Sequence, residues 1–503
     1  MKRVRKTVIG LDVGTTTVKA VLVSDNGDVL SVSNIGQSVS VPRPGWTEQD
    51  PRIWWKSSVS AIQNILNKSH HFPEGIDISA IGLSGQMHSA VFLNEVGEVI
   101  RPAPLWNDMR TTSQCHQIIE RLGMSGLHRT VGNLALEGFT APKLLWLRDN
   151  EPGNFSRLRK LLLAKDYVRY RLTGELCTDP SDASGTILYD VRNREWSQEI
   201  LEALNLPIDN LPDLVDSVDI SGEVSRGIAT ELGISAGIPV VGGGADNAAG
   251  AVGSGVVVRG RVQSSIGTSG TLLLPLDHPH IDEKMRLHTF CHCVTNQWYL
   301  MGTILSAGNS LRWLRDVIGG SNACLSYDQL TSEADQVKAG SDGLFFLPYL
   351  AGERTPHNNP DARGVFFGLH LGHTRGHLVR SVMEGVCFAL RDSLELMRDT
   401  GIDFEEVRAI GGGAHSKLWR QIQADVFNVP VVTPNPSGGA AYGAALMAAV
   451  GAGIFGSIAE GVESWVRSGE VTEPNVTSAD SYDELYDAYR KLYPALQGRF
   501  ENR

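Results

Sequence analysis

The sequence predicts an α/β protein made of two related domains with a cleft between them. At 503 residues the chain is too long for one ordinary domain. A strand, turn and strand pattern near the N-terminus, VIGLDVGTTTVKAVLV, is echoed in the second half by VQSSIGTSGTLLLPL. A short strand that runs into a Gly-containing loop, SAIGLSGQMHSAVFLN, is echoed by VRAIGGGAHSKLWRQIQADVF. Because both echoes come in the same order, they favour a duplication with a domain boundary near Ala251 to Arg261.

Individual elements follow from apolar spacing and turn signals. The opening predicts a meander of three strands, and Asn26-Gly27 is typical of the hairpin turn between the second and third. Residues Pro51 to Lys68 have helical apolar spacing, with Asp50 and Pro51 at the expected start. Near the C-terminus, Ser481-Tyr482-Asp483-Glu484 has the form of a capping box. It predicts the start of a closing helix that ends before Pro494.

Composition narrows the class of protein and its partners. A hydrophobic content of 42% describes a globular chain with an ample core, and the formal charge of −11 argues against nucleic-acid or anionic-membrane surfaces. No run of about 18 uncharged apolar residues occurs, so no membrane span is predicted. The basic start has no cleavage site and only a short apolar run, and the six cysteines are sparse. We therefore expect a cytoplasmic protein with reduced thiols; its oligomeric state is left open, a homodimer included.

The run His288-Thr289-Phe290-Cys291-His292-Cys293 has two interpretations. Its residue types can bind zinc, but no second Cys/His pair stands at a typical ligand spacing nearby. Its alternation, followed by QWYLMG, is more typical of a pair of strands. We favour the strand pair.

Gly244-Ala245-Asp246-Asn247 is the most informative run in the chain. It places one carboxylate in a loop made mostly of Gly and Ala, directly after an apolar strand-like run. Small neighbours leave room for a substrate to approach Asp246 closely, and such an acid is suited to act as a general base on a hydroxyl. The alternative is an ordinary tight turn.

Three further Gly-containing loops have the composition of phosphate-binding turns, in which backbone N–H groups and small residues let oxygens come close. They are Asp12 to Thr17, Gly267 to Gly270 and Gly411 to Ser416. Each alone is equally typical of a plain connector, but together with the Asp246 loop they predict a phosphate-handling site. The chain has no G-x-x-x-x-G-K-[ST] run, and no G-x-G-x-x-G in a strand–helix setting, so P-loop and dinucleotide folds are not predicted.

Taken together, these segments resemble the FGGY family of carbohydrate kinases. The resemblance covers residues 8 to about 450 and rests on DVGTTTVKA, SGQMHSAVFLN, LWNDMR, GGGADNAAGAVGSG, IGTSGTLLL, FLPYLAGERTPHNNPDARGVFFGL and IGGGAHSKLWRQIQADV. It implies two ribonuclease-H-like domains of the actin/hexokinase type, with sugar and ATP meeting in the cleft between them. Residues 1–253 would then form a sugar-binding domain with the Mg²⁺ and phosphate turn, and residues 254–503 an ATP-binding domain.

The resemblance also implies roles for single residues. Asp246 would be the catalytic base and Asp12 would help to hold Mg²⁺. The sugar would contact Met87, His88, Asp246 and Asn247. ATP would be lined by Thr15, Thr16, Thr268, Gly308, Gly412, Gly413 and Ser416.

The chemistry of the residues agrees with these roles, although each has a plain structural alternative. His88 on a small-residue loop can exchange hydrogen bonds with sugar hydroxyls, or can be an ordinary buried histidine. Met87 is more typical of core filler, so its sugar contact would be through the backbone. Trp106 offers an apolar face for sugar C–H groups, or can be buried between domains.

Within the family, SGQMH and LWND are most similar to the members that phosphorylate D-xylulose. Two positions depart from that pattern: Met109 stands where a Gly is common, and Ser437 to Ala440 lacks a common Glu. We therefore expect ATP-dependent phosphorylation of D-xylulose. A kinase for ribulose, glycerol or another polyol, and a non-catalytic actin-like ATPase regulator, remain the alternatives.

Overall fold

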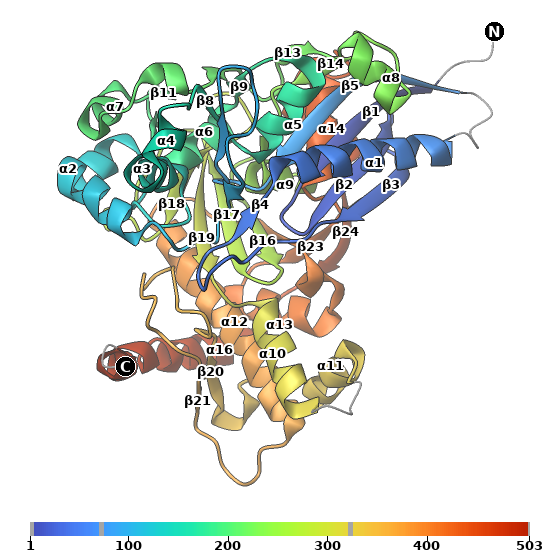
Figure 1. Cartoon of the computed structure of the whole chain (residues 1–503). Helices are drawn as coiled ribbons and strands as arrows, with labels where there is room; N and C mark the ends of the chain where they lie inside the picture. The colour runs from blue at the N-terminus through green and yellow to red at the C-terminus, as the bar shows by residue number, and fades with distance from the viewer. Residues whose placement is uncertain (1–4, 70–74, 320–324, 501–503) are drawn as a thin grey trace.

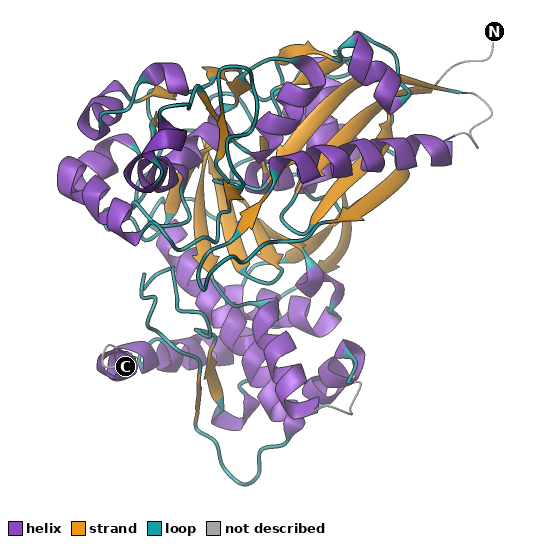
Figure 2. Cartoon of the chain, viewed as in Figure 1, coloured by secondary structure: helices purple, strands orange, loops and turns teal. Residues whose placement is uncertain are grey.

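The computed structural model describes residues 5–69, 75–319 and 325–500. Two seven-stranded sheets form the centres of two α/β domains (Figures 1 and 2). The first sheet is built from strands in the first 245 residues, and the second from strands that begin at Arg261. This is the two-domain α/β architecture that the sequence predicts.

The first sheet combines a meander with parallel strands. Its order is β13 (Ile220–Glu223), β14 (Pro239–Val241), β5 (Ile76–Gly85), β1 (Arg5–Val13), β2 (Thr17–Ser24) and β3 (Val29–Gly36), and β15 (Gly244–Ala245) also pairs with β5. Strands β1, β2 and β3 are antiparallel, as predicted, whereas β5 runs parallel to β1. Helix α1 (Pro51–Ser69) starts at the predicted proline.

The second sheet repeats this plan. Its order is β18 (His288–Cys291), β19 (Trp298–Ile304), β17 (Gly270–Leu276), β16 (Arg261–Ile266), β22 (Glu406–Ile410), β23 (Val431–Asn435) and β24 (Arg467–Thr472). Strands β16, β17 and β19 form the meander, and β22 lies parallel to β16 as β5 lies parallel to β1. The duplication predicted from the echoed segments is therefore confirmed, and β18 with β19 confirms the strand pair at HTFCHCV.

One helix of the second half packs inside the first domain. Helix α14 (Ala440–Gly451) lies against β1, β5 and α9 (Asp246–Ser254). Its approach is too close for side chains on the sheet, since a Cβ on Gly10 would lie 1.9 Å from the Ala441 carbonyl oxygen. A Cβ on Gly82 would lie equally close to the Ala444 carbonyl oxygen. The two domains are thus tied together by backbone-to-backbone packing.

The second domain extends below its sheet in the view of Figure 1. This region contains α10 (Gly308–Gly319), α11 (Tyr327–Asp335), β20 (Phe345–Leu347), β21 (Val365–Phe367), α12 (Arg375–Arg398), α13 (Lys417–Phe427), α16 (Val476–Tyr489) and α17 (Leu492–Phe500). Among residues 5–69, 75–319 and 325–500, no helix has both the length and the apolar character that crossing a membrane requires.

The predicted start of the C-terminal helix is wrong, whereas its predicted end before Pro494 is confirmed, because α16 ends at Tyr489. Helix α16 begins at Val476, where the Asn475 side chain accepts hydrogen bonds from the backbone N–H groups of Thr477 and Ser478. Ser481 lies inside that helix, and its hydroxyl donates to the Thr477 carbonyl. A local capping pattern is therefore overridden by a better cap six residues earlier, at Asn475.

The remaining helices and short strands lie outside the two seven-stranded sheets. The helices are α2 (Thr112–Thr130), α3 (Thr140–Asn150), α4 (Pro152–Phe155), α5 (Ala164–Thr173), α6 (Pro180–Ala183), α7 (Gln198–Leu204), α8 (Arg226–Leu232) and α15 (Ile458–Trp465). The short strands are β4 (Glu48–Gln49), β6 (Val91–Leu93), β7 (Ala103–Pro104), β8 (Lys160–Leu162), β9 (Cys177–Thr178), β10 (Tyr189–Asp190), β11 (Glu195–Trp196) and β12 (Asp213–Leu214).

Candidate active site

The two acidic residues singled out by sequence lie on either side of the end of β5. Ser84 near the end of β5 is paired with Asp12 of β1 on one side and with Gly244 of β15 on the other. Asp246 follows β15 directly as the first residue of α9. The loop needs glycine here, because Gly243 has φ +74° and its Cβ would lie 2.3 Å from the Leu83 carbonyl oxygen. Segments more than 200 residues apart thus bring two carboxylates together.

Burial raises the pKa of both carboxyl groups. Burial, followed by the nearby charge of Asp12, raises the pKa of Asp246 to about 7, although hydrogen bonds from Asn247 act in the opposite direction. These bonds come from the Asn247 backbone N–H at 2.7 Å and the side-chain Nδ2 at 2.9 Å. Burial raises the pKa of Asp12 to about 6, against the opposing charge of Lys19. A carboxylate with a pKa near neutrality is suited to accept a proton from a hydroxyl.

Asp12 has the chemistry of a magnesium ligand. Its Oδ1 atom is buried and has no hydrogen-bond partner. Among the described residues, no group of three or more His, Cys, Asp or Glu side chains is arranged to hold a metal ion. Mg²⁺ does not need such a group, since it keeps several waters and is usually bound through one or two carboxylates plus substrate phosphates. The residues present therefore fit Mg²⁺ bound with a nucleotide.

His88 is held in an unusual backbone conformation next to this pair. Its φ of +68° lies in the left-handed region, which non-glycine residues adopt rarely. The His88 carbonyl oxygen accepts hydrogen bonds from Lys143 Nζ at 2.9 Å and Thr140 Oγ1 at 3.2 Å. Burial, followed by the charge of Lys143, lowers the pKa of His88 to about 3, so the imidazole is neutral. Nδ1 donates to the Gly185 carbonyl at 2.7 Å, which leaves Nε2 as an acceptor for a ligand hydroxyl.

Met87 and Asn247 connect the two loops. Asn247 Nδ2 lies 3.6 Å from the Met87 sulfur. The Met87 side chain is only 3% exposed. This is the core-filling position that its residue type suggests, so a ligand would reach the Met87 backbone rather than its side chain.

Trp106 is placed at an open face of the site. Its side chain is 40% exposed, and its Nε1 donates to Thr15 Oγ1 at 3.0 Å. Thr15 Oγ1 donates in turn to Gln86 Oε1 at 3.0 Å. Gln49 completes the network, accepting from Gln86 Nε2 at 3.2 Å and donating to the Thr15 carbonyl at 2.7 Å. Sequence reasoning missed Gln49, because a glutamine in a short strand has no distinctive motif. Gln86 lies in the SGQMH run, but the run does not show what its side chain binds.

A cavity of about 470 Å³ lies in the second domain, at the turn between β16 and β17, the start of α10 and the loop between β22 and α13. Five of the seven residues predicted to line ATP line it: Thr268, Gly308, Gly412, Gly413 and Ser416. Gly267 and His415 also line it and lie within the loops predicted to bind phosphate. Sequence reasoning missed the remaining lining residues: Ile266, Asn309, Leu311, Arg312, Tyr327, Asp328, Thr331 and Trp419.

Thr15 and Thr16 do not line this cavity. They lie in the first domain, at the turn between β1 and β2 that also follows Asp12. Thr15 is engaged with Gln86 and Trp106, and Thr16 is exposed. Contact between these threonines and a nucleotide stays a prediction.

Family comparison agrees with this geometry. The N-terminal domain model of the FGGY family of carbohydrate kinases matches residues 7–253, and the C-terminal domain model matches residues 262–452. The chain belongs to this family. This FGGY kinase is therefore a phosphotransferase of the sugar kinase type, and its fold is that of the two-domain kinases related to actin and hexokinase.

Similar proteins cover nearly the whole of this FGGY kinase. A xylulose kinase from Staphylococcus xylosus is 39% identical over 486 residues, which are 97% of this chain and 99% of that protein. A gluconokinase from Bacillus subtilis is 32% identical over 502 residues, which are 98% of this chain and 96% of that protein. The ligand-bound crystal structure of a xylulose kinase from Lactobacillus acidophilus superposes with a TM-score of 0.92 at 28% identity, over 99% of each chain.

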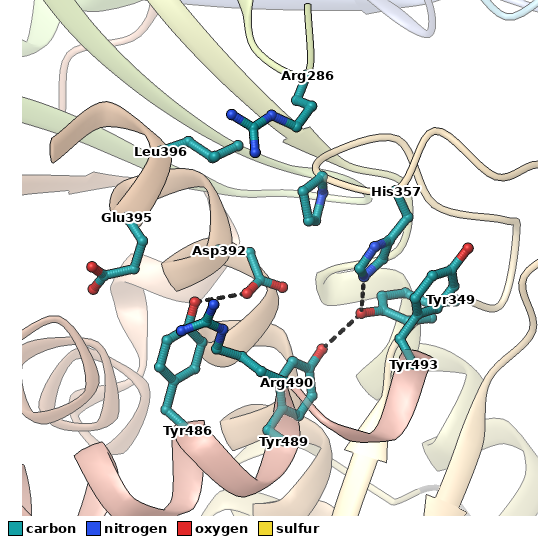
Figure 3. Close-up of a pocket in the computed structure, with 11 residues that line it drawn as sticks. Arg286, Tyr349, His357, Asp392, Glu395, Leu396, Tyr486, Tyr489, Arg490 and Tyr493 are labelled. Carbon is teal, nitrogen blue, oxygen red and sulfur yellow. Dashed lines mark hydrogen bonds between the residues drawn. The ribbon is translucent and has the colours of Figure 1, made fainter. Parts of the chain in front are cut away.

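A second cavity in this FGGY kinase shares no residue with the predicted site. It has a volume of about 230 Å³ and lies between α12, the C-terminal helices α16 and α17, and the loop around His357 (Figure 3). Tyr486 donates to Asp392 at 2.7 Å, and burial raises the pKa of Asp392 to about 7. Tyr349 links Tyr489 and His357 by hydrogen bonds of 3.3 Å each. Since the hydroxyls of its four tyrosines all take part in hydrogen bonds within the protein, this cavity belongs to the packing of the C-terminal helices.

Proposed function

We propose that this FGGY kinase transfers the γ-phosphoryl group of ATP to the terminal hydroxyl of D-xylulose, with Asp246 as the catalytic base. One observation carries the proposal: Asp246 has a pKa raised to about 7 and lies beside the loop that presents Met87 and His88. The choice of sugar is supported by the likeness to the xylulose kinases.

In this reaction, Asp246 orients the terminal hydroxyl and accepts its proton as the bond to phosphorus forms. Phosphoryl transfer relies mostly on positioning and charge neutralisation, so a fixed carboxylate suits it. His88 Nε2 accepts a hydrogen bond from a second sugar hydroxyl, Asn247 keeps Asp246 oriented, and Trp106 covers the C–H face of the sugar.

The second domain would bind the nucleotide in the cavity lined by Thr268, Gly308, Gly412, Gly413 and Ser416, and residues 1–253 would bind the sugar. Ser416 caps α13 by accepting from the Trp419 backbone N–H at 3.2 Å, so phosphate oxygens would lie near a helix N-terminus. Asp12 would hold Mg²⁺, which supplies charge neutralisation to the phosphates when bound. Thr15 and Thr16 would face the phosphates from the opposite domain.

A coupled assay of ADP release tests the proposal with D-xylulose, D-ribulose, glycerol, gluconate and no sugar. Gluconate is included because of the gluconokinase relative. We expect the largest kcat/KM with D-xylulose. A preference for another sugar would refute the substrate while keeping the kinase, and equal ATP hydrolysis with and without every sugar would favour an actin-like ATPase.

A further inference from the structure

A fully buried group of charged side chains lies close to the loops that carry Asp246 and His88. Lys165 Nζ lies 2.7 Å from Asp166 Oδ1, 2.8 Å from Asp179 Oδ1 and 2.9 Å from Asp182 Oδ2. All four side chains are inaccessible to solvent. The group packs against the sugar loop, since a Cβ on Gly85 would lie 3.2 Å from the Lys165 Cβ and backbone nitrogen.

The charges in this group compensate one another. Arg169 Nη2 donates to Asp166 Oδ1 at 2.9 Å. Burial opposes the charge on Lys165, but its neighbouring carboxylates outweigh burial and raise its pKa. Burial raises the pKa of Asp182 well above its ordinary value, against the opposing charge of Lys165. Buried ion pairs add little net stability over apolar packing, and some are retained because they fix one conformation.

Arg169 of this group, and Ser181 beside it, bind the loop that precedes Asp246. Arg169 Nη1 donates to the Gly242 carbonyl, three residues before Ala245. Ser181 Oγ accepts the backbone N–H of Ala245 at 2.9 Å and donates to Asp179 Oδ2. The same Asp179 oxygen accepts Ser217 Oγ at 3.0 Å, and the Ser217 carbonyl accepts the Gly243 N–H at 2.9 Å. The backbone from Gly242 to Ala245 is therefore anchored at three points.

The segment Asp179 to Gly185 also holds the sugar loop, because the Gly185 carbonyl accepts a hydrogen bond from His88 Nδ1 at 2.7 Å. One short segment, pinned by Lys165 through Asp179 and Asp182, thus fixes both the predicted base and the predicted sugar ligand.

We propose that Ser181 is a positioning residue for phosphoryl transfer. Anchored by Asp179 and Lys165, it holds Ala245 so that the Asp246 carboxylate stays aligned with the hydroxyl of the sugar bound at His88. This inference rests on the proposed kinase function and adds a residue that touches neither sugar nor nucleotide.

The test compares Ser181→Ala with Ser341→Ala. Ser341 is equally buried and its Oγ also donates to a buried carboxylate, that of Glu384 at 2.8 Å, but it lies in the second domain and is not among the residues that line the 470 Å³ cavity. Both variants remove one buried hydroxyl and should lower Tm by similar amounts. Only Ser181→Ala should lower kcat, by about 10-fold, because misplacement of a reacting group by a fraction of an ångström is costly. KM for ATP should stay unchanged, and the ratio of sugar phosphorylation to sugar-independent ATP hydrolysis should fall.

Either of two results overturns the inference: a wild-type kcat in Ser181→Ala, or an equal loss of kcat in Ser341→Ala. Ser217→Ala is the second variant if Ser181→Ala does not fold; it should lower kcat by a smaller factor, and an unchanged kcat overturns the inference equally. A wild-type enzyme that phosphorylates none of the sugars would instead refute the proposed function, so the two failures are distinguishable.

Discussion

Replacing Asp246 by asparagine should abolish turnover and at the same time stabilise the protein. Asparagine has the same shape and keeps an oxygen that accepts the Asn247 backbone N–H, which Asp246 binds at 2.7 Å. It cannot accept a proton, so kcat should fall by about 10²-fold or more. A variant that is damaged by misfolding would lose activity and stability together, whereas this variant should lose only activity.

The expected stabilisation follows from the pKa. In the folded protein burial raises the pKa of Asp246 from 3.8 to about 7, a difference of about three units. At about 1.4 kcal/mol per unit this sets an upper limit of roughly 4 kcal/mol on the cost of ionised Asp246. The side chain is partly open to solvent, which screens its charge, so we expect a gain of roughly 1–2 kcal/mol in the free energy of unfolding.

The pH dependence gives the sign of the effect. The folded state binds the Asp246 proton more tightly than the unfolded state, so this carboxyl lowers stability as pH rises from about 4 to about 7. The gain in Asp246→Asn should therefore be complete above pH 7 and fade as pH falls toward 4. Thermal melts at pH 8.5 and pH 4.5 in magnesium-free buffer, beside a coupled kinetic assay, measure both effects. A lower Tm than wild type at pH 8.5 would refute the buried-charge reasoning, and near-wild-type kcat would refute the base.

Three further outcomes are expected. Asp12→Ala should raise the Mg²⁺ concentration needed for half-maximal rate while leaving KM for the sugar nearly unchanged; a normal Mg²⁺ titration with weakened sugar binding would contradict the assignment. His88→Ala should reduce the preference for D-xylulose over its C3 epimer D-ribulose, which we expect to be about 1–3 kcal/mol in kcat/KM for one mispaired hydroxyl; an unchanged ratio would remove His88 from the specificity site. Saturating sugar and a non-hydrolysable ATP analogue should reduce the radius of gyration in small-angle scattering, because the facing domains must close to exclude water; an unchanged profile would count against closure.

The parts of the molecule that could be predicted from sequence are those in which a short segment has a distinctive composition at a predicted strand end. The Gly and Thr turn after β16 and the Gly-rich loop after β22 are strand ends with little side-chain bulk, and both line the cavity that we propose as the nucleotide site. The Asp246 loop was predictable for the same reason, since an acid among glycines and alanines is locally unusual. Such features can be recognised within one short segment of the chain, without knowing which other segments pack against it.

What could not be predicted depends on contacts between distant segments. Helix α14 is apolar on all sides and gives no amphipathic stripe to show where it packs; its place against Gly10 and Gly82 follows only from the tertiary structure. The capping box at Ser481 failed because a neighbouring asparagine caps the helix earlier. Gln49 and Gln86 act through a network that joins four separate segments of the first domain. Gln49 has no motif of its own, and the SGQMH run does not show what the Gln86 side chain binds.

The residues that hold the Asp246 loop in place are harder to predict from sequence than Asp246 itself. Ser181 and Ala245 are 64 residues apart in sequence, and only the fold of α5 and α6 under β15 brings the hydroxyl to the backbone N–H. A base that works by orientation needs a loop with few conformations, yet glycines make the loop flexible. Gly243 is needed because a side chain there would collide with the Leu83 backbone, and a side chain at Gly242 would collide with the Asp216 carbonyl, so rigidity has to come from outside the loop. Arg169, and Ser181 anchored by Asp179, bind the backbone of the loop and supply that rigidity. The small residues leave room around Asp246, and the buried charged group around Lys165 keeps the loop in place.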